Sequence, residues 1–574
     1  MSQNNRRTIR GVHFLKLQGT EVERAKSYGE LLKNEIPHGP LSALAKKNEW
    51  LIRRSPGVLQ WKPLQDSVVQ LYKKVFAPLI ASRFTKEESD VAQAFANACG
   101  IPLEVCQESA LQPDTLMLLC RLSLVKHLIP EWSLRELPGC SSAVVPPALT
   151  QSGRMLVCRN LDYPLVGPWE SQTTVSFHEP EDKSEIPHVS VASAGVFTSG
   201  LTSMNREGLT LATHAHFGKN VSLQGRPIVC IGNDVIRKAR TLGQAVDICR
   251  KAKRIGNWSF VVSSAKEKSG VIIQMTSDQT RVCEPSDFAD QCLVHSNYFH
   301  AEDLQKSEAL LSGGSHEDLQ DRVCRMRQIL AEHRGHLEPK HLSAALGDQR
   351  DSRTGEERAF GGTLGVVTTV ASVVFEPESQ KLWVSARGES PMGLGDFLEV
   401  DVDRFWNSPS AESDSLPILP GYQPQNPALI NGIRLFREAY RAWHLQNDRD
   451  DFAERALSFL DGAIAAYPQD GHLWLQGAMV AFHLGKFEKA RPLLEEALKR
   501  SLSEHLQGVG RLFLGRCWDL LGQRGQAIDL YRSGLNAREP RLRTAFQEGL
   551  KHPYRAKDCG KMMIDLQFPD PFMY

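Results

Sequence analysis

The sequence predicts an α+β domain followed by an all-α region, and three observations carry this prediction. Residues 1–139 show apolar side chains at helical spacing, residues 140–400 alternate short β-rich runs with helical stretches, and residues 428–574 are helical and repetitive. Strands and helices that alternate in blocks are typical of a layered domain with sheets inside and helices outside. A chain of 574 residues is long enough for two or more domains.

Residues 1–139 are expected to be mostly helical. Thr85 precedes an acidic first turn, which is an N-cap signal for a helix. Residues 111–129 form a longer and strongly apolar helical stretch. Pro138-Gly139 then ends the helical segment, and a strand is expected to begin at Cys140.

Between residues 140 and 400 the hydrophobic pattern changes to short runs bounded by glycine, proline, asparagine or aspartate. Such runs predict strands. The helical pattern interrupts them twice, at residues 228–252 and 319–334. The expected strands cover residues 144–145, 155–158, 173–177, 189–192, 209–213, 258–263, 270–275, 280–283, 291–295, 365–375 and 381–386.

Residues 401–427 are rich in serine and proline and are expected to be a linker. Beyond them, Ala456, Ala490 and Ala527 recur at spacings of 34 and 37 residues, each with a small residue seven positions later. Small residues at these points allow paired helices to pack closely. The spacing resembles about three degenerate tetratricopeptide repeats over residues 428–574. A generic helical bundle is the alternative.

Composition excludes several classes of function. The 68 basic residues almost balance the 67 acidic ones, so the chain has no large net positive charge that would attract nucleic acid or anionic lipid. The basic N-terminus has no apolar stretch behind it, and no run of the chain approaches the roughly 18 apolar residues of a membrane span. We therefore expect a soluble, cytoplasmic protein without a membrane span.

The twelve cysteines show no Cys-x-x-Cys motif and no zinc-ligand spacing with histidine. Most are therefore expected to be small core residues in a reducing compartment. Cys140 differs because Gly139 and two serines flank it at the start of an apolar run. A second run ends in Arg159 and Asp162. In this layout the thiol can attack, the cation can lower the pKa of the thiol, and the carboxylate can orient an amine.

These motifs resemble a known family. Pro138-Gly139-Cys140-Ser141-Ser142, followed by residues 153–163 with Arg159-Asn160 and Asp162-Tyr163, is similar to the start of the mature chain in acyl-coenzyme A:6-aminopenicillanate acyltransferase-like N-terminal nucleophile hydrolases. The resemblance covers about residues 8–400. Supporting blocks lie, in the family's order, at residues 204–211, 295–299 and 369–377. Two departures are a tyrosine, Tyr298, where the family has histidine, and a slightly longer spacing from Cys140 to Asp162.

The resemblance implies a four-layer αββα sandwich and a precursor that cuts itself between Gly139 and Cys140. The new α-amino group of Cys140 would serve as the base, and residues 1–139 would stay packed against the core. Asp162 would hold the α-ammonium group, and Arg159 would stabilise the thiolate and bind a polar group of the substrate. Asn297 would donate to the oxyanion. The alternatives are a buried strand cysteine, a structural ion pair between Arg159 and Asp162, and a turn asparagine.

Family members also use a later arginine before the closing strand. Arg350, Arg353 and Arg358 are candidates, and Arg353 is favoured. His216 and Trp169 are expected near the substrate, with ordinary core packing as the alternative. His214 and His216 share a strand face, but no third ligand accompanies them, so neither a metal nor a cofactor is expected.

The sequence thus predicts a self-processing cysteine amidohydrolase or acyltransferase that forms an acyl-enzyme on Cys140. Its substrate would be a small N-acyl amide or acyl thioester, and water or an acceptor amine would resolve the intermediate. The helical repeats would bind a peptide or protein partner. The alternative is a catalytically inactive relative that acts as a binding module through its repeats.

Overall fold

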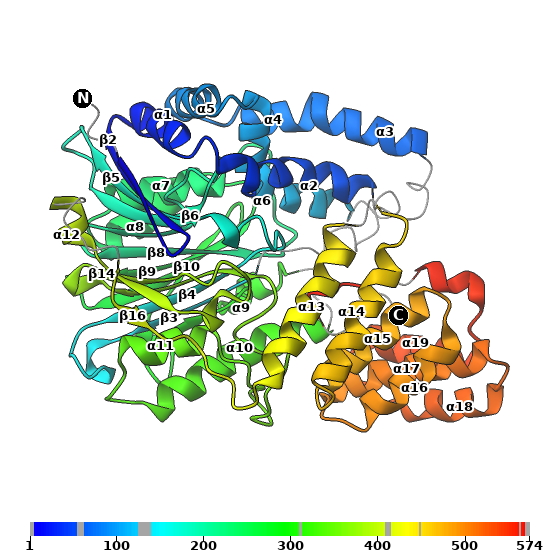
Figure 1. The fold of residues 1–574 in the computed structure, drawn as a ribbon. Coiled ribbons are helices and arrows are strands. Elements are labelled where there is room, and N and C mark those ends of the chain that lie inside the picture. Colours follow the sequence, from blue (N-terminus) through cyan, green and yellow to red (C-terminus); the bar gives the residue numbers. More distant parts are fainter. Residues whose placement is uncertain are drawn as a thin grey trace. The chain divides into compact units, whose positions relative to one another are not determined.

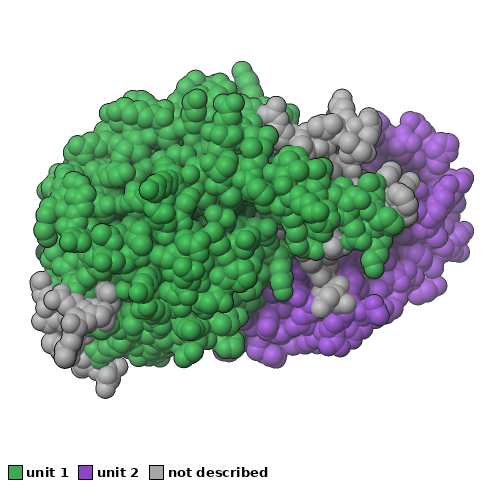
Figure 2. Space-filling model, turned by 90° about the horizontal axis from the view of Figure 1, so that it is seen from above, with its two compact units in different colours: residues 1–310, 326–348, 368–422 green, residues 311–325, 349–367, 423–574 purple. Residues whose placement is uncertain are grey.

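The computed structural model describes residues 5–53, 62–123, 139–308, 313–407, 415–446, 449–561 and 564–568. The chain forms two compact units (Figure 2). Unit 1 comprises residues 1–310, 326–348 and 368–422, and unit 2 comprises residues 311–325, 349–367 and 423–574. Unit 2 therefore takes two segments from the part of the chain in which the sequence predicts the α+β domain. Each unit is described by itself.

Unit 1 contains two sheets (Figure 1). The larger sheet has the strand order β1-β2-β5-β6-β7-β8-β9-β10-β11. Its neighbours are antiparallel except β2 and β5, which run parallel. The strands are β1 Asn5–Ile9, β2 Val12–Gly19, β5 Thr173–Pro180, β6 His188–Ser193, β7 Thr202–Asn205, β8 Leu209–His216, β9 Asn257–Ser264, β10 Ser269–Met275 and β11 Thr280–Cys283.

The smaller sheet has the strand order β12-β3-β4-β13-β14-β15-β16 and is antiparallel throughout. Its central strands carry the predicted nucleophile and its neighbours. The strands are β3 Gly139–Val145, β4 Leu156–Asp162, β12 Leu293–His295, β13 Thr369–Glu376, β14 Lys381–Ser385, β15 Phe397–Asp401 and β16 Ile418–Leu419.

The two sheets share one hydrophobic core. Val144 and Val157 of the smaller sheet belong to the same buried cluster as Phe14 and Val175 of the larger sheet. Leu15, the neighbour of Phe14 on β2, belongs instead to a second cluster shared with helices. Successive residues of a strand point to opposite faces, so the larger sheet is covered on both sides.

Helices α1 and α5 cover the outer face of β2, where Tyr28 and Phe95 belong to the second cluster. Capping boxes at Thr20 and Thr85 begin these two helices, as predicted at Thr85. Helix α11 packs on β4 and β13 of the smaller sheet. The helices of this unit are α1 Glu21–Leu31, α2 Leu41–Arg53, α3 Lys62–Leu71, α4 Ala77–Ala81, α5 Lys86–Cys99, α6 Leu103–Ser123, α7 Ile228–Lys238, α8 Leu242–Lys251, α9 Glu302–Gln305, α11 Pro339–Leu346 and α12 Val402–Asn407.

Residues 1–139 differ from the expectation at their start. They are mostly helical where described, but β1 and β2 form a hairpin that joins the larger sheet. Arg10 and Gly11 both have positive φ at its turn, where a glycine is favoured. The parallel pairing of β2 with β5 joins segments about 160 residues apart, and a local pattern does not predict such a contact. The four-layer αββα assignment itself stays a prediction.

Residues 401–427 also contain more regular structure than a linker. Helix α12 follows β15 directly, and β16 pairs with β15 at the edge of the smaller sheet. Residues 408–414 of this stretch lie outside the described ranges.

Unit 2 is helical. Helices α13 and α14, α15 and α16, and α17 and α18 pack as consecutive pairs. Ala456, Ala490 and Ala527 are fully buried, as their predicted role in close packing requires. The helices are α10 Gly313–Glu332, which begins in unit 2 and ends in unit 1, α13 Ala428–His444, α14 Phe452–Ala466, α15 Gly471–His483, α16 Phe487–Leu498, α17 Glu504–Leu520, α18 Arg524–Ser533 and α19 Pro540–Lys551. The assignment to tetratricopeptide repeats stays a prediction.

None of the helices within the described ranges is both long and apolar enough to cross a membrane.

Candidate active site

The thiol of Cys140 lies at the start of β3, and its neighbour across the strand pair is Leu161 of β4. Arg159 lies two residues before Leu161 in β4, in the diagonal position on the same face, which a long side chain can bridge. Arg159 Nη2 donates a hydrogen bond to Cys140 Sγ at 3.3 Å. The two side chains are 1% and 2% exposed, so this contact is shielded from water.

Main-chain carbonyls hold the Arg159 guanidinium in place. Nη1 donates to Leu201 O at 2.7 Å, and Nη2 donates to Thr213 O at 2.7 Å. In the described ranges no carboxylate lies within ion-pair distance of this guanidinium, so the alternative of a structural ion pair with Asp162 does not describe it. A buried cation without a counterion is costly for stability, and such groups concentrate at functional sites.

Burial raises the pKa of the Cys140 thiol above its ordinary value. The charge and hydrogen bond of Arg159 act in the opposite direction, and the negative charge of Asp162 adds to the rise. The sequence predicted that the cation would lower this pKa, but burial outweighs it. Cys140 Sγ donates to Thr213 O at 3.5 Å, which fits a neutral thiol. The thiol therefore needs a base before it can attack.

Asp162 lies directly opposite Gly139 in the strand register, beside the peptide bond that joins Gly139 to Cys140. Its side chain is fully buried, and Oδ1 accepts a hydrogen bond from Thr369 Oγ1 at 2.7 Å. The carboxylate is thus oriented from β13 and close enough to influence the charge state of the thiol.

Asn297 follows β12 and holds the backbone nitrogen of Cys140. The Cys140 N–H donates to Asn297 Oδ1 at 2.6 Å, and Asn297 Nδ2 donates to Ala215 O at 2.9 Å. A backbone N–H can only donate and a carbonyl can only accept, so these partners fix which side of the amide faces Cys140. In this arrangement Asn297 positions the group that would become the α-amine. Its role at an oxyanion stays a prediction.

The structure places the remaining predicted residues in different surroundings. Trp169 is buried, lines the cavity beside Cys140 and stacks on Tyr163 with ring centroids 5.2 Å apart. His216 is fully buried, contacts Ser259 Oγ through Nε2 at 2.7 Å and stacks on Phe299. It does not line the cavity.

Arg353 belongs to unit 2, where its guanidinium pairs with Asp321 at 3.0 Å and with Glu317 at 3.8 Å. Arg350 and Arg358 lie in the same unit. The assignment of a late arginine to the reaction stays a prediction.

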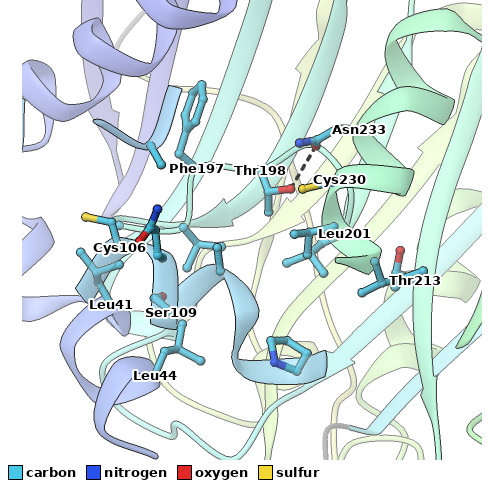
Figure 3. Close-up of a pocket in the computed structure, with 18 of the residues that line it drawn as sticks. Leu41, Leu44, Cys106, Ser109, Phe197, Thr198, Leu201, Thr213, Cys230 and Asn233 are labelled. Atoms are coloured by element: carbon cyan, nitrogen blue, oxygen red, sulfur yellow. Dashed lines mark hydrogen bonds between the residues drawn. The ribbon is translucent and has the colours of Figure 1, made fainter. Parts of the chain in front are cut away.

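An apolar cavity opens beside Cys140 (Figure 3). The cavity has a water-accessible volume of about 140 Å³. Figure 3 shows Leu41, Leu44 and Cys106 on helices at one side, with Cys230 and Asn233 at the other. Several lining residues come from the segment before Cys140, among them Leu41, Leu44, Phe84, Val91, Phe95 and Pro113. Residues 1–139 therefore build much of the wall, which the sequence did not predict.

Asn233 is a polar residue in this otherwise mostly apolar wall. Its Oδ1 accepts from Thr198 Oγ1 at 3.0 Å and from Ser199 N at 2.8 Å. Because the Ser199 N–H can only donate, the amide oxygen must face it, and Nδ2 faces away. Nδ2 has no hydrogen-bond partner among the described residues, so it is a donor available to a ligand.

Histidines gather behind the site. His214 Nε2 lies 2.8 Å from Ser142 Oγ, and His214 contacts the His295 ring, which in turn lies against His216. Burial lowers the pKa of His216 and His295 well below the ordinary value, so both rings are neutral. Among the described residues, no three histidine, cysteine, aspartate or glutamate side chains come together to hold a metal ion.

A family model matches part of the chain. The model described as acyl-coenzyme A:6-aminopenicillanic acid acyl-transferase matches residues 149–390. The matched range contains Arg159, Asp162 and Asn297, and it begins after Cys140. It confirms the predicted resemblance for this part of the chain.

One solved structure that resembles the chain is the Caenorhabditis elegans N-acylethanolamine-hydrolyzing acid amidase (NAAA) ortholog. It is 18% identical, the match covers 42% of this chain and 93% of that chain, and the TM-score is 0.31. A likeness at so low a TM-score supports no conclusion about the substrate or mechanism of this chain. No curated protein matches the chain.

The cavity geometry predicts that Leu44→Gln weakens the binding of an apolar acyl compound. Leu44 is buried in the cavity wall, and glutamine has a similar size but places a polar amide where leucine offers apolar surface to an acyl chain. In a Cys140→Ala background, which prevents turnover, decanoyl amide can be titrated against the fluorescence of Trp169 and Trp258, which line the cavity. We expect a loss of affinity of at least about tenfold.

Leu223→Gln in the same background is the matched control, because Leu223 is 38% exposed and lies outside the cavity wall. It should leave the affinity unchanged. Equal affinities for the two variants would contradict the cavity as a site for apolar ligands.

Proposed function

We propose that this protein is a self-processing N-terminal nucleophile enzyme that cleaves or transfers the acyl group of small N-acyl amides or acyl thioesters. One observation carries the proposal. Cys140 Sγ lies beside an apolar cavity and 3.3 Å from a buried guanidinium that has no carboxylate partner among the described residues. A nucleophile, a charge to stabilise it and room for an acyl group therefore meet at one point.

Processing would begin with attack of the Cys140 thiol on the carbonyl carbon of Gly139. The C–N bond between the two residues breaks, the acyl group of Gly139 moves to sulfur, and the nitrogen of Cys140 gains the thiol proton and becomes an amine. Water then hydrolyses the thioester, which leaves a carboxylate on Gly139 and restores the thiol. The hydrogen bond from the Cys140 N–H to Asn297 supports this step, because it fixes the position of the nitrogen in the intact chain.

In turnover, the α-amine of Cys140 would remove the proton from its own thiol. An α-amino group has an ordinary pKa of about 8, which suits a base that works near neutral pH. The raised pKa of the buried thiol makes such a base necessary, and Arg159 would stabilise the thiolate once it forms. Asp162 would hold the α-ammonium group.

The thiolate would then attack the carbonyl carbon of the substrate. Asn297 Nδ2, which has a second N–H beyond the one bound to Ala215, would donate to the oxyanion. Collapse of the intermediate transfers the proton from the α-ammonium to the leaving amine and leaves a thioester on Cys140. Water or an acceptor amine resolves this thioester, with release of the acid or of a new amide.

The acyl group would lie along the apolar wall, with Trp169 against it and the free Nδ2 of Asn233 bound to a carbonyl or hydroxyl oxygen of the substrate. His216 would not contact the substrate; its stacking on Phe299 would hold β8 in place behind the site. We include Arg353 as a predicted catalytic residue on the family resemblance alone.

Residues 1–139 would remain bound after the cut, because many contacts join them to the rest of unit 1. β2 pairs with β5 along seven residues. The carboxylate of Asp114 on α6 accepts from the backbone N–H of Ile228 at 2.8 Å and from Trp258 Nε1 at 3.1 Å. Arg237 forms ion pairs with Glu21 and Glu87.

The acyl-enzyme can be trapped directly. We expect a rapid quench with decanoyl thioester to add one decanoyl group to the fragment that begins with Cys140, and we expect no such adduct in Cys140→Ala, which lacks a nucleophile at this position. Asn297→Leu should slow acylation by about 10²–10³-fold, the typical cost of one oxyanion donor. Intact mass and peptide mapping identify the modified residue.

An adduct on Cys106 or Cys230, which also line the cavity, or no adduct at all, would contradict this role of Cys140. Repeating the quench with and without an acceptor amine separates transfer from hydrolysis.

Retention of the N-terminal fragment is a further prediction. On size exclusion without denaturant, residues 1–139 should elute together with residues 140–574, because the cavity wall and the larger sheet both depend on them. In urea the two chains should separate. Elution of active residues 140–574 without the N-terminal fragment would contradict the proposed cavity wall.

A further inference from the structure

The cavity beside Cys140 has a buried end and a half-buried end. At the buried end, Cys140 and Arg159 are almost completely inaccessible to water. At the other end the wall includes Glu21 of α1, Glu88 of α5 and Asn233 of α7, and all three are half-buried. A substrate whose scissile carbonyl reaches Cys140 therefore extends from the buried end toward these three residues.

The two ends also differ in charge. Arg159 brings a positive charge to the buried end, whereas Glu21 and Glu88 bring carboxylates to the half-buried end. Each carboxylate has an ion-pair partner, Arg237 for Glu21 and Arg226 for Glu88, but neither arginine belongs to the cavity wall that the described residues form. A negatively charged group of a ligand would therefore meet like charge at the half-buried end.

Asn233 supplies a hydrogen-bond donor at the same end, and its direction is fixed. The two bonds that Oδ1 accepts, from Thr198 Oγ1 and from the Ser199 N–H, hold the plane of the amide. Cys230 lies one turn earlier on the same side of α7, and Figure 3 shows both side chains at this part of the wall. A donor that is already held in place loses little freedom when it binds an acceptor.

Ser109 of α6 is a second polar residue in the wall, across the cavity from Asn233 (Figure 3). It is buried, and no hydrogen bond joins its hydroxyl to any described residue. By contrast, Ser67 and Ser89 donate to the carbonyl oxygen four residues earlier in their helices, as helical serines commonly do. The Ser109 hydroxyl rotates freely, so it selects a ligand group less sharply than the fixed amide of Asn233.

We propose that the acyl group of the substrate is an apolar chain whose far end carries a neutral acceptor oxygen, such as that of a ketone, and that Asn233 Nδ2 binds this oxygen. The inference rests on the proposed function, which places the scissile carbonyl at Cys140. A chain that ends in a methyl group leaves the Asn233 N–H without an acceptor. A chain that ends in a carboxylate is repelled by Glu21 and Glu88. A ketone oxygen accepts a hydrogen bond and carries no charge, so it fits both features.

The test measures binding to the full Cys140→Ala chain, which has no nucleophile at this position, through the fluorescence of Trp169 and Trp258 in the cavity wall. The probes are primary amides of saturated acyl chains of six to twelve carbons. Each is compared with a chain of equal length that has a ketone at its penultimate carbon, and with one that ends in a carboxylate. At the length that spans the cavity, we expect the ketone to bind at least about tenfold more tightly than either of the others.

The variant Asn233→Asp isolates the donor. It keeps an oxygen that accepts from Thr198 and Ser199, and it replaces the Nδ2 donor with a second acceptor. We expect it to abolish the preference for the ketone and to leave the affinity for the plain chain unchanged within about twofold, which also shows that the variant is folded. Asn97→Asp, the same substitution at an exposed position of α5 outside the wall, is the matched control. It should keep the preference, as should Ser109→Ala.

The outcomes separate this inference from the proposed function. Equal affinities of ketone and plain chains at every length would overturn the inference and leave the apolar acyl site in place. A preference that survives Asn233→Asp, or that disappears in Ser109→Ala, would overturn it as well, because Asn233 would then not be the donor. A carboxylate chain that binds as tightly as the ketone would contradict the exclusion of anions. Binding of none of the chains would overturn both this inference and the proposed use of the cavity.

Discussion

The site depends on a buried guanidinium that no carboxylate neutralises within the described residues. Arg159 is held by the carbonyl oxygens of Leu201 and Thr213, which orient it but carry no full charge. Its positive charge is therefore available to the Cys140 sulfur beside it. A cation in such surroundings costs stability, and the cost is consistent with a group kept for chemistry rather than for folding.

Two opposing effects on the thiol explain why the proposed chemistry needs the chain to be cut. Burial raises the pKa of Cys140 more than Arg159 lowers it, so the thiol of the intact chain stays protonated. In the intact chain its own nitrogen is an amide, which cannot act as a base. Cleavage would turn that nitrogen into an amine at a position that Asn297 already fixes. The proposed base would thus be created at the place where the proton must be removed.

The sequence was informative where function depends on neighbouring strands and uninformative where it depends on packing over long distances. Cys140, Arg159 and Asp162 could be predicted together because β3 and β4 are adjacent and their side-chain alternation is local. Asn297 could be found only through the family resemblance, since it follows β12, a strand that joins the sheet much later in the chain. The carbonyl oxygens that bind Arg159 belong to the main chain, so no residue type in the sequence marks them. The cavity wall built by residues 1–139 and the pairing of β2 with β5 likewise arise from tertiary packing, which periodicity does not encode.

The central claim is that the peptide bond before Cys140 is cut by the thiol of that residue, and the intact mass of the purified protein tests it most directly. The account predicts two species, residues 1–139 and residues 140–574, in the native sequence. A Cys140→Ala variant, prepared in the same way, should give only the full-length mass. A single full-length species in both samples after days at neutral pH would contradict self-processing, and with it the assignment of the Cys140 amine as the base.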